Sequence, residues 1–427
     1  MKKEEFAKIC ELIQRNLQEI TKEFDDIWRK RVRLIGTQIL MAFIFKTVLS
    51  KNKQGYGSTA IELWNNFSIK KIRTQQARAI SASAMCQARK NLSPEAFTLL
   101  NDRIIEDWEK VKEENLWHGY RLFAVDGSKV NLPRELIREG YKTPGEHSYY
   151  PQGLVSCLYE LEHKIPYDFE IVNHCNERIS AIKHLEVLKE GDLAIFDRGY
   201  FSYVMLKGYQ EKGVLTVFRL QKNICYKEIQ EFCDGKEPEK IVILEAPKKT
   251  KEKVARGEIE INLEPVKVRL VKYNVSGKSY VVATTVLTEA ISKEEIAGLY
   301  HERWGIEELY KVTKEIIEVE DFHGKTEQGV KQELYAHFVL ITITRMLGET
   351  AEKKTRGKIN FKNCINVIRQ ALEELIFLKT KRFIKKCMRW ILESMGRIYQ
   401  KARPGRSYPR ISKKPLKRWK SSLKKRQ

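Results

Sequence analysis

The sequence contains no long hydrophobic run and no clustered metal-ligand residues. No segment approaches the 18 or more apolar residues of a membrane-spanning helix, and the first residues, MKKEEFAKIC, lack the apolar core of a signal peptide. The eight cysteines include no Cys-x-x-Cys pair, and His301-Glu302 lacks the second histidine of a zinc-protease helix. We therefore expect a cytoplasmic protein with reduced thiols, without a membrane span, a disulfide framework or a zinc site.

Acidic residues are also scarce relative to basic ones. Lysine and arginine number 79 against 56 aspartates and glutamates, which gives a formal net charge of +23. Residues 401–427 hold 12 lysines or arginines and no acid. This balance favours an anionic partner such as nucleic acid, with the tail binding phosphates non-specifically. Ribosome-associated and membrane-surface proteins can be equally basic.

The length and the hydrophobic periodicity predict several domains of an α/β protein. At about 150 residues per domain, 427 residues suggest two to four. The pattern is helical to about Trp117, typical of strands from Tyr120, and helical again after Lys331. The predicted divisions are a helical DNA-binding region (1–118), the first part of an α/β core (119–221), a β-rich insertion (222–287), the last part of the core (288–350) and a helical end with the basic tail (351–427).

Two helical patterns in the N-terminal region fit a DNA-reading motif. A first segment, TAIELWNNF, is followed by a short connection over Ser68 to Arg73 and a second helix over about Ala77 to Ala88. Two short helices with a tight link fit a helix-turn-helix, although they also fit any small helical bundle. We expect Arg89 and Lys90, at the end of the second helix, to contact DNA.

Two aspartates stand in unusual positions on predicted strands. Asp126 interrupts the apolar run RLFAVDGSKVNLP, and a charge within a buried strand costs several kcal/mol unless it is paired or metal-bound. The alternative is an aspartate that opens a turn before Gly127. Asp197 ends the apolar strand Leu193 to Phe196, where ligands gather in open α/β sheets, or it caps the following helix.

The other elements expected between Tyr120 and Leu287 are mostly strands. We predict a hairpin of two strands, Tyr149 to Leu161 and Lys164 to Val172, followed by a helix over Ser180 to Lys189 and another that starts near Phe201. A further strand is expected over Leu215 to Leu220. Four strand segments are expected in the insertion: KIVILEA, EIEINL, VKVRLVKYNV and KSYVVATTVL.

A single helix is predicted from Tyr300 to Lys314. At about 100° per residue, Tyr300, Arg303, Glu307 and Lys314 share a stripe about 60° wide, while apolar residues from Ile306 onward occupy the opposite side. The helix would therefore pack from behind and present one carboxylate flanked by cations. An amphipathic helix whose solvated face is laced with ion pairs fits the same pattern.

Asp126, Asp197 and Glu307 together suit a hard divalent cation. Mg²⁺ takes one or two protein carboxylates plus phosphate oxygens, and two ions about 3.5 to 4 Å apart support phosphodiester chemistry. Arg303 and Lys314 would hold phosphates, and Tyr300 would add a hydroxyl contact. A metal-free acid/base pair is less attractive because no histidine stands beside any of the three carboxylates.

The strings VDGS, FDRGY and Tyr-x2-Arg-x3-Glu-x6-Lys, in this order, resemble the DDE transposases of bacterial insertion sequences, in particular the IS-four type. All four positions of the Tyr-Arg-Glu-Lys signature are filled. SASAMCQARKNLSPEAF and SYPRISKKPLKRW are also similar to that family, so the resemblance covers most of the chain.

This resemblance implies an RNase H-like core, with Asp126 on the first strand, Asp197 after the fourth and Glu307 on a late helix. It implies that the three carboxylates ligate two Mg²⁺ ions, with Mn²⁺ as a substitute. Tyr300, Arg303 and Lys314 would hold DNA near the cleaved end, and we add Arg198 as a DNA contact. The implied partners are terminal inverted repeats and target DNA, within a homodimeric synapse at the bacterial nucleoid.

The implied reaction is hydrolysis at the transposon ends, followed by attack of the new 3′-hydroxyl on target DNA. One departure concerns the hairpin step of some relatives, in which a flipped base stacks on a tryptophan of the β insertion. No tryptophan occurs between Trp117 and Trp304, although Tyr273 or Tyr280 could substitute. The alternatives are an inactive or domesticated relative that binds DNA ends, and a non-mobile nuclease of the same fold.

Overall fold

A computed structural model describes residues 2–400 apart from 29–33, 51–53, 113–114, 222–223, 225, 276, 317, 354 and 356. The basic tail, 401–427, and its predicted phosphate binding lie outside the described residues. Within the described residues, no helix combines the length and the apolar character needed to cross a membrane.

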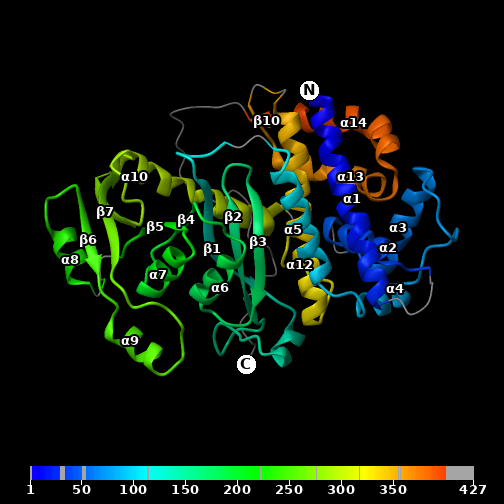
Figure 1. The fold of residues 1–427 in the computed structure, drawn as a ribbon. Helices are drawn as coiled ribbons and strands as arrows, with labels where there is room; N and C mark the ends of the chain where they lie inside the picture. Colours follow the sequence, from blue (N-terminus) through cyan, green and yellow to red (C-terminus); the bar gives the residue numbers. More distant parts are fainter. Residues whose placement is uncertain are drawn as a thin grey trace.

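An eight-stranded mixed sheet forms the centre of the protein (Figure 1). Its order is β3-β2-β1-β4-β5-β8-β7-β6, and β4 pairs in parallel with β1 and β5 while all other neighbours are antiparallel. The strands are β1 (Arg121–Asn131), β2 (Gln152–Glu160), β3 (Ile165–Val172), β4 (Asp192–Phe196), β5 (Leu215–Arg219), β6 (Glu239–Leu244), β7 (Val266–Val275) and β8 (Lys278–Thr284). A small second sheet pairs β9 (Lys358–Ile359) with β10 (Tyr399–Gln400).

Helices from both ends of the chain gather on one side of the sheet (Figure 1). The central helix of this group, α12, packs on α1, α2, α5, α13, α14 and strand β3. The helices are α1 (Lys2–Trp28), α2 (Thr37–Leu49), α3 (Tyr56–Ile69), α4 (Ala82–Arg89), α5 (Glu95–Glu109), α6 (Glu177–Lys183), α7 (Tyr203–Glu211), α8 (Lys227–Asp234), α9 (Lys248–Ala255), α10 (Lys293–Glu302), α11 (Trp304–Lys311), α12 (Glu327–Glu352), α13 (Phe361–Phe377) and α14 (Thr380–Arg397). The predicted α/β class is confirmed.

The sheet separates two hydrophobic cores. Ala124 of β1 belongs to the larger core, which also holds α11 and the helices from both chain ends, whereas Phe123 and Val125 belong to a smaller core with α6, α7 and α8. Successive side chains of a strand point to opposite faces, so this division follows from the strand geometry. Asp126 therefore faces the same side as Ala124 and α11, and Gly127 faces the side of α6.

Several predicted elements match the structure and others do not. The hairpin is confirmed as β2 and β3, and strands β4, β5, β6, β7 and β8 fall in predicted segments. The expected strand EIEINL is wrong because residues 258–263 form no strand, and the stretch 222–287 also contains α8 and α9. Strands β6, β7 and β8 extend the central sheet through the β5–β8 pairing.

The predicted tight helix-turn-helix geometry is also wrong. Helix α3 ends at Ile69 and α4 begins at Ala82, so residues 70–81 separate the two helices. The predicted single helix from Tyr300 to Lys314 consists of three parts: α10 ends at Glu302, Arg303 forms the junction to α11, and a π-helical turn covers Val312–Ile316. π-helical turns are frequent near functional sites.

His337, in the middle of α12, predicts an acid sensitivity of the fold. Its side chain is buried, and burial lowers the pKa of the imidazole to about 4. In the unfolded chain the pKa of this imidazole is about 6.5, so the unfolded state takes up a proton at a higher pH than the folded state does. The free energy of unfolding therefore falls as pH drops from about 6.5 to 4. Between pH 7 and pH 4, the free energy of unfolding of His337→Phe should fall by about 3 kcal/mol less than that of wild type. Urea denaturation at each pH measures this difference. Equal losses in both proteins would contradict this.

Candidate functional site

Strand register brings Asp126 and Asp197 together. The parallel strands β1 and β4 align Val125 with Phe196. Asp126 follows Val125 and Asp197 follows Phe196, so the two aspartates come next at the same level. Strand β1 continues beyond this level beside β2, whereas β4 ends at Phe196. The aspartates thus lie side by side at the carboxyl end of a central parallel strand, where ligands commonly bind in open sheets.

Tyr300 and Arg303 link these aspartates to Glu307. The Tyr300 hydroxyl donates to Oδ1 of Asp197 at 3.0 Å and accepts from Nε of Arg303 at 3.3 Å. Another nitrogen of the same guanidinium donates to Oε1 of Glu307 at 2.5 Å, and Nη1 lies 3.7 Å from Oδ2 of Asp126. All three predicted carboxylates therefore converge on one tyrosine-arginine pair at the α10–α11 junction.

Burial and neighbouring charges shift the pKa values of groups in this network. The Arg303 side chain is 5% exposed and that of Asp126 is 22% exposed, while that of Glu307 is 46% exposed. Burial raises the pKa of Asp126 to about 6, an effect larger than the opposing effect of Arg303. Burial disfavours the charge on Arg303, but Tyr300 and the two aspartates outweigh it and raise its pKa. Such perturbed groups at a strand end are typical of functional sites.

Two further side chains bind the backbone beneath the site. The buried Tyr310 hydroxyl donates to the carbonyl oxygens of Asp126 at 2.7 Å and Val155 at 3.2 Å, which ties α11 to β1 and β2. The Lys314 amine donates to the carbonyl of Lys129 at 2.7 Å. The sequence prediction missed Tyr310 because a tyrosine on an amphipathic helix carries no distinguishing local signal.

The donor set fits a divalent cation in its chemistry. Three carboxylates supply hard oxygen donors, and the Arg303 guanidinium occupies the position of a cation among them. No group of three or more acidic, histidine or cysteine side chains in the described part of the chain is already close enough to hold a metal ion.

The remaining predicted DNA contacts fall in different environments. Arg198, next to Asp197, and Lys90, after α4, are exposed. Arg89 is 5% exposed and forms an ion pair with buried Glu333 at 2.8 Å, with another hydrogen bond to Gln332 of α12 at 3.0 Å. The prediction for Arg89 does not fit the structure, since its guanidinium is buried between α4 and α12.

Arg219 adds a cation that the sequence prediction missed. It ends β5, and the register between Phe196 and Phe218 places it beside Asp197. Its guanidinium lies 4.7 Å from the ring centroid of Tyr280, which stacks on Tyr273 of β7 at 5.5 Å. The reasoning that selected Asp197, a charged residue at the carboxyl end of an apolar strand, also applies to Arg219.

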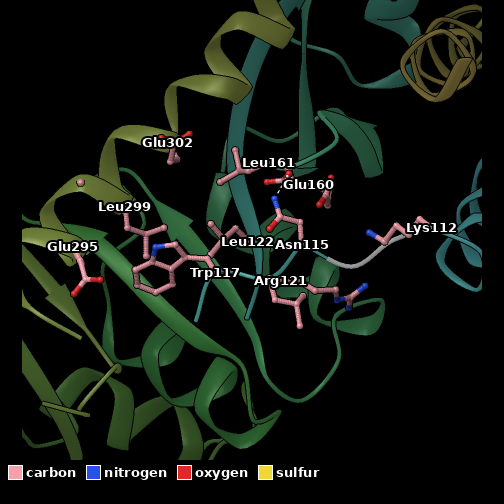
Figure 2. Close-up of a pocket in the computed structure, with 13 residues that line it drawn as sticks. Lys112, Asn115, Trp117, Arg121, Leu122, Glu160, Leu161, Glu295, Leu299 and Glu302 are labelled. Atoms are coloured by element: carbon pink, nitrogen blue, oxygen red, sulfur yellow. Dashed lines mark hydrogen bonds between the residues drawn. The ribbon is translucent and has the colours of Figure 1, made fainter. Parts of the chain in front are cut away.

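A cavity of about 530 Å³ lies beside another part of α10 (Figure 2). Leu299 and Glu302 line it together with Trp117 from the segment before β1. Its glutamates include two that are already paired: Glu295 with His118 at 2.8 Å and Glu162 with Asn115 at 2.7 Å. None of Asp126, Asp197 and Glu307 lines this cavity, so it is separate from the cluster around Arg303.

A comparison with known proteins finds a family domain in the part of the chain that carries this cluster. The family model described as "Transposase DDE domain" matches residues 117–343, a range that contains Asp126, Asp197, Arg303 and Glu307. A probable transposase for insertion sequence element IS5377 from Geobacillus stearothermophilus is 24% identical over 165 residues. That alignment covers 39% of this chain and 42% of the relative, so the chain spans less than half the length of the curated relative it matches.

A solved structure gives a more distant likeness. The cryo-EM structure of a piggyBac transposase synaptic complex with hairpin DNA superposes with a TM-score of 0.44 and 11% identity. The superposition covers 94% of this chain and 86% of that chain.

Proposed function

Because the chain belongs to the family of transposases with a DDE domain, we propose that it cleaves DNA at transposon ends and joins those ends to target DNA. The observation that carries this proposal is the convergence of Asp126, Asp197 and Glu307 around Arg303 within the matched segment. The IS-four type is part of the proposal, supported by Tyr300, Arg303, Glu307 and Lys314 at the signature spacing.

We also propose an RNase H-like arrangement for the catalytic core. Asp126 lies on β1, Asp197 follows β4, and Glu307 lies on α11 after four further strands, which is the order expected from the sequence. Residues 119–221 and 288–350 would form this core, and residues 222–287 would be the inserted segment. Residues 1–118 and 351–427 would flank it.

Asp126, Asp197 and Glu307 would hold Mg²⁺, with two ions as the proposed number and Mn²⁺ as a substitute. Such ions activate an attacking oxygen and neutralise charge on the leaving oxygen. Tyr300 positions Asp197 through its hydroxyl, and Arg303 fixes Glu307. The Arg303 guanidinium would pair with a DNA phosphate if it left its carboxylate partners.

The proposed partners are terminal inverted repeats, target DNA and a second copy of the chain in the synapse. The net charge of +23 supports DNA as a partner. Lys314, Arg198 and Lys90 are further proposed phosphate contacts. A substitute for the missing tryptophan of a hairpin step would be Tyr280, which lies under Arg219 next to the site.

Joining of DNA ends distinguishes this function from that of a nuclease. The test incubates the purified protein with a supercoiled target plasmid and pre-cut labelled ends that carry free 3′-hydroxyls. Labelled joined plasmid should form in Mg²⁺ and not in EDTA, because Mg²⁺ supports attack by the 3′-hydroxyl. A parallel reaction with ends blocked at the 3′-hydroxyl is the control. Cleavage without joined products would favour a non-mobile nuclease, and binding without either would favour an inactive relative.

A further inference from the structure

Arg219 is a second guanidinium at the carboxylate cluster, and its contacts differ from those of Arg303. Arg303 donates to Glu307 at 2.5 Å and lies 3.7 Å from Asp126. Arg219 forms no ion pair with a carboxylate of the described residues. A guanidinium carries five N–H donors whose arrangement matches the oxygens of a phosphate. Arg219 can therefore bind an anion without first leaving a carboxylate.

The register of three parallel strands places Arg219 in line with both aspartates. Phe196 of β4 aligns with Val125 of β1 on one side and with Phe218 of β5 on the other. The next residues on β1, β4 and β5 are Asp126, Asp197 and Arg219. Strand β4 lies between β1 and β5, so Arg219 is the neighbour of Asp197 on the side away from Asp126.

Arg219 also faces the side of the sheet on which α11 packs. It pairs with Val282 of β8, and Val282 belongs to the larger core that holds α11. Residues paired across antiparallel strands share a face, so the Arg219 side chain points to the side of Asp126. The Tyr300 hydroxyl accepts from Nε of Arg303 at 3.3 Å and is also hydrogen-bonded to Arg219. Tyr300 therefore contacts both guanidinium groups.

Two stacked tyrosines support the Arg219 guanidinium. It lies 4.7 Å from the ring centroid of Tyr280 on β8, and that ring stacks on Tyr273 of β7 at 5.5 Å. The His301 ring of α10 lies nearly perpendicular to Tyr273, at 6.0 Å between centroids. A guanidinium that stacks on an aromatic ring keeps the N–H groups in its plane available for hydrogen bonds. This support holds Arg219 in place before a ligand binds, so less side-chain freedom is lost on binding.

Arg219 combines a stable positive charge with access from solvent. Burial disfavours the charge, but the hydrogen bond to Tyr300 and the charge of Asp197 outweigh burial and raise the pKa of the Arg219 guanidinium. The Arg219 side chain is partly exposed, whereas that of Arg303 is 5% exposed. A phosphate can therefore reach Arg219 directly, while the carboxylate partners of Arg303 shield that residue.

We propose that Arg219 binds a backbone phosphate of the DNA strand that is cut, while Arg303 positions Asp126 and Glu307. Because Arg219 stands next to Asp197, the phosphate that it holds is the scissile one or a close neighbour. A bidentate contact between guanidinium and phosphate also fixes the orientation of the strand. This inference rests on the proposed cleavage of DNA and names a substrate-binding residue for it.

Loss of one phosphate charge at a time tests the role of Arg219. Binding of the full chain to the element's end is measured in Ca²⁺, with duplexes in which a neutral methylphosphonate replaces a single phosphate near the cleavage point. At one position the wild type should lose about tenfold in affinity. Arg219→Gln should lose as much on the unmodified duplex and nothing further at that position. The slope of log affinity against log salt should flatten by about 0.9 in Arg219→Gln.

Lys212→Gln is the matched control for Arg219→Gln. Lys212 is exposed and precedes the other end of β5, so this variant should keep the affinity and the methylphosphonate sensitivity of wild type. Arg219→Lys keeps the charge without the planar fork and should lose less affinity than Arg219→Gln. Thermal unfolding of each variant shows whether it is folded.

The outcomes separate this inference from the function on which it rests. If wild type cuts the end in Mg²⁺ but every methylphosphonate weakens wild type and folded Arg219→Gln equally, the role of Arg219 is overturned and the proposed function stands. Equal losses in Arg219→Gln and Lys212→Gln would reduce the effect to general surface charge and would also overturn the inference. A wild type that neither cuts nor joins the element's ends in Mg²⁺ would overturn both.

Discussion

Replacing Asp126 or Asp197 with asparagine, or Glu307 with glutamine, should lower the rate of Mg²⁺-dependent cleavage at transposon ends by about 10³-fold or more. Each change removes a negative oxygen donor, and loss of several kcal/mol of transition-state stabilisation corresponds to this factor. The measurement is the single-turnover rate on a labelled duplex that carries the element's ends. Affinity for the same duplex, measured in Ca²⁺, should remain within a few-fold of wild type.

The control for this prediction is Glu302→Gln. Glu302 is exposed on α10, one residue before Arg303, and lines the cavity in Figure 2, outside the carboxylate network. This variant removes the same charge from the same helix and should cleave at the wild-type rate. A variant of Asp126, Asp197 or Glu307 that retains wild-type cleavage would remove that residue from the proposed site.

Replacing Arg89 with alanine should lower the free energy of unfolding by about 3–5 kcal/mol. The change removes the guanidinium partner of Glu333, a carboxylate that is 1% exposed and then keeps the backbone N–H donors of His323 and Gly324. Hydrogen bonds from the guanidinium to Gln332 and to the carbonyl of Gly329 are lost as well. The measurement is the free energy of unfolding from urea denaturation followed by circular dichroism.

Lys90→Ala is the matched control for Arg89→Ala. Lys90 is exposed, so its replacement should change the free energy of unfolding by less than about 0.5 kcal/mol. If Lys90 contacts a phosphate, the same change should weaken DNA binding. The double change Arg89→Met with Glu333→Leu should recover part of the lost stability, because no charge stays buried while the backbone N–H groups of His323 and Gly324 lose their acceptor. Stability loss below 1 kcal/mol in Arg89→Ala, with a specific loss of DNA affinity, would restore Arg89 as a DNA contact.

The sequence could predict the candidate carboxylates because their signals are local. Asp126 interrupts an apolar strand and Asp197 ends one, and each pattern lies within a few neighbouring residues. Placing the two together required the parallel pairing of β1 and β4, which aligns Val125 with Phe196 across residues distant in the chain. Strand identity was therefore predictable, whereas register is an outcome of the assembled sheet.

The features that the sequence missed depend on contacts between distant segments. Arg89 ends a helix and looks exposed from its neighbours, but its partner Glu333 lies on α12. Tyr310 carries no distinguishing local signal, and only the folded chain brings its hydroxyl to the carbonyl oxygens of Asp126 and Val155. The junction at Arg303 is likewise tertiary, since the residue contacts Asp126, Tyr300 and Glu307 at once. Propensity and periodicity cannot report such packing.

Cleavage of a labelled duplex carrying the element's ends, by wild type and Glu307→Gln in Mg²⁺ and in EDTA, tests the central claim most directly. The expected result is cutting by wild type in Mg²⁺ alone, and binding without cutting by Glu307→Gln. Equal cutting by both proteins, or cutting by wild type that persists in EDTA, would contradict a metal-dependent site built from these carboxylates.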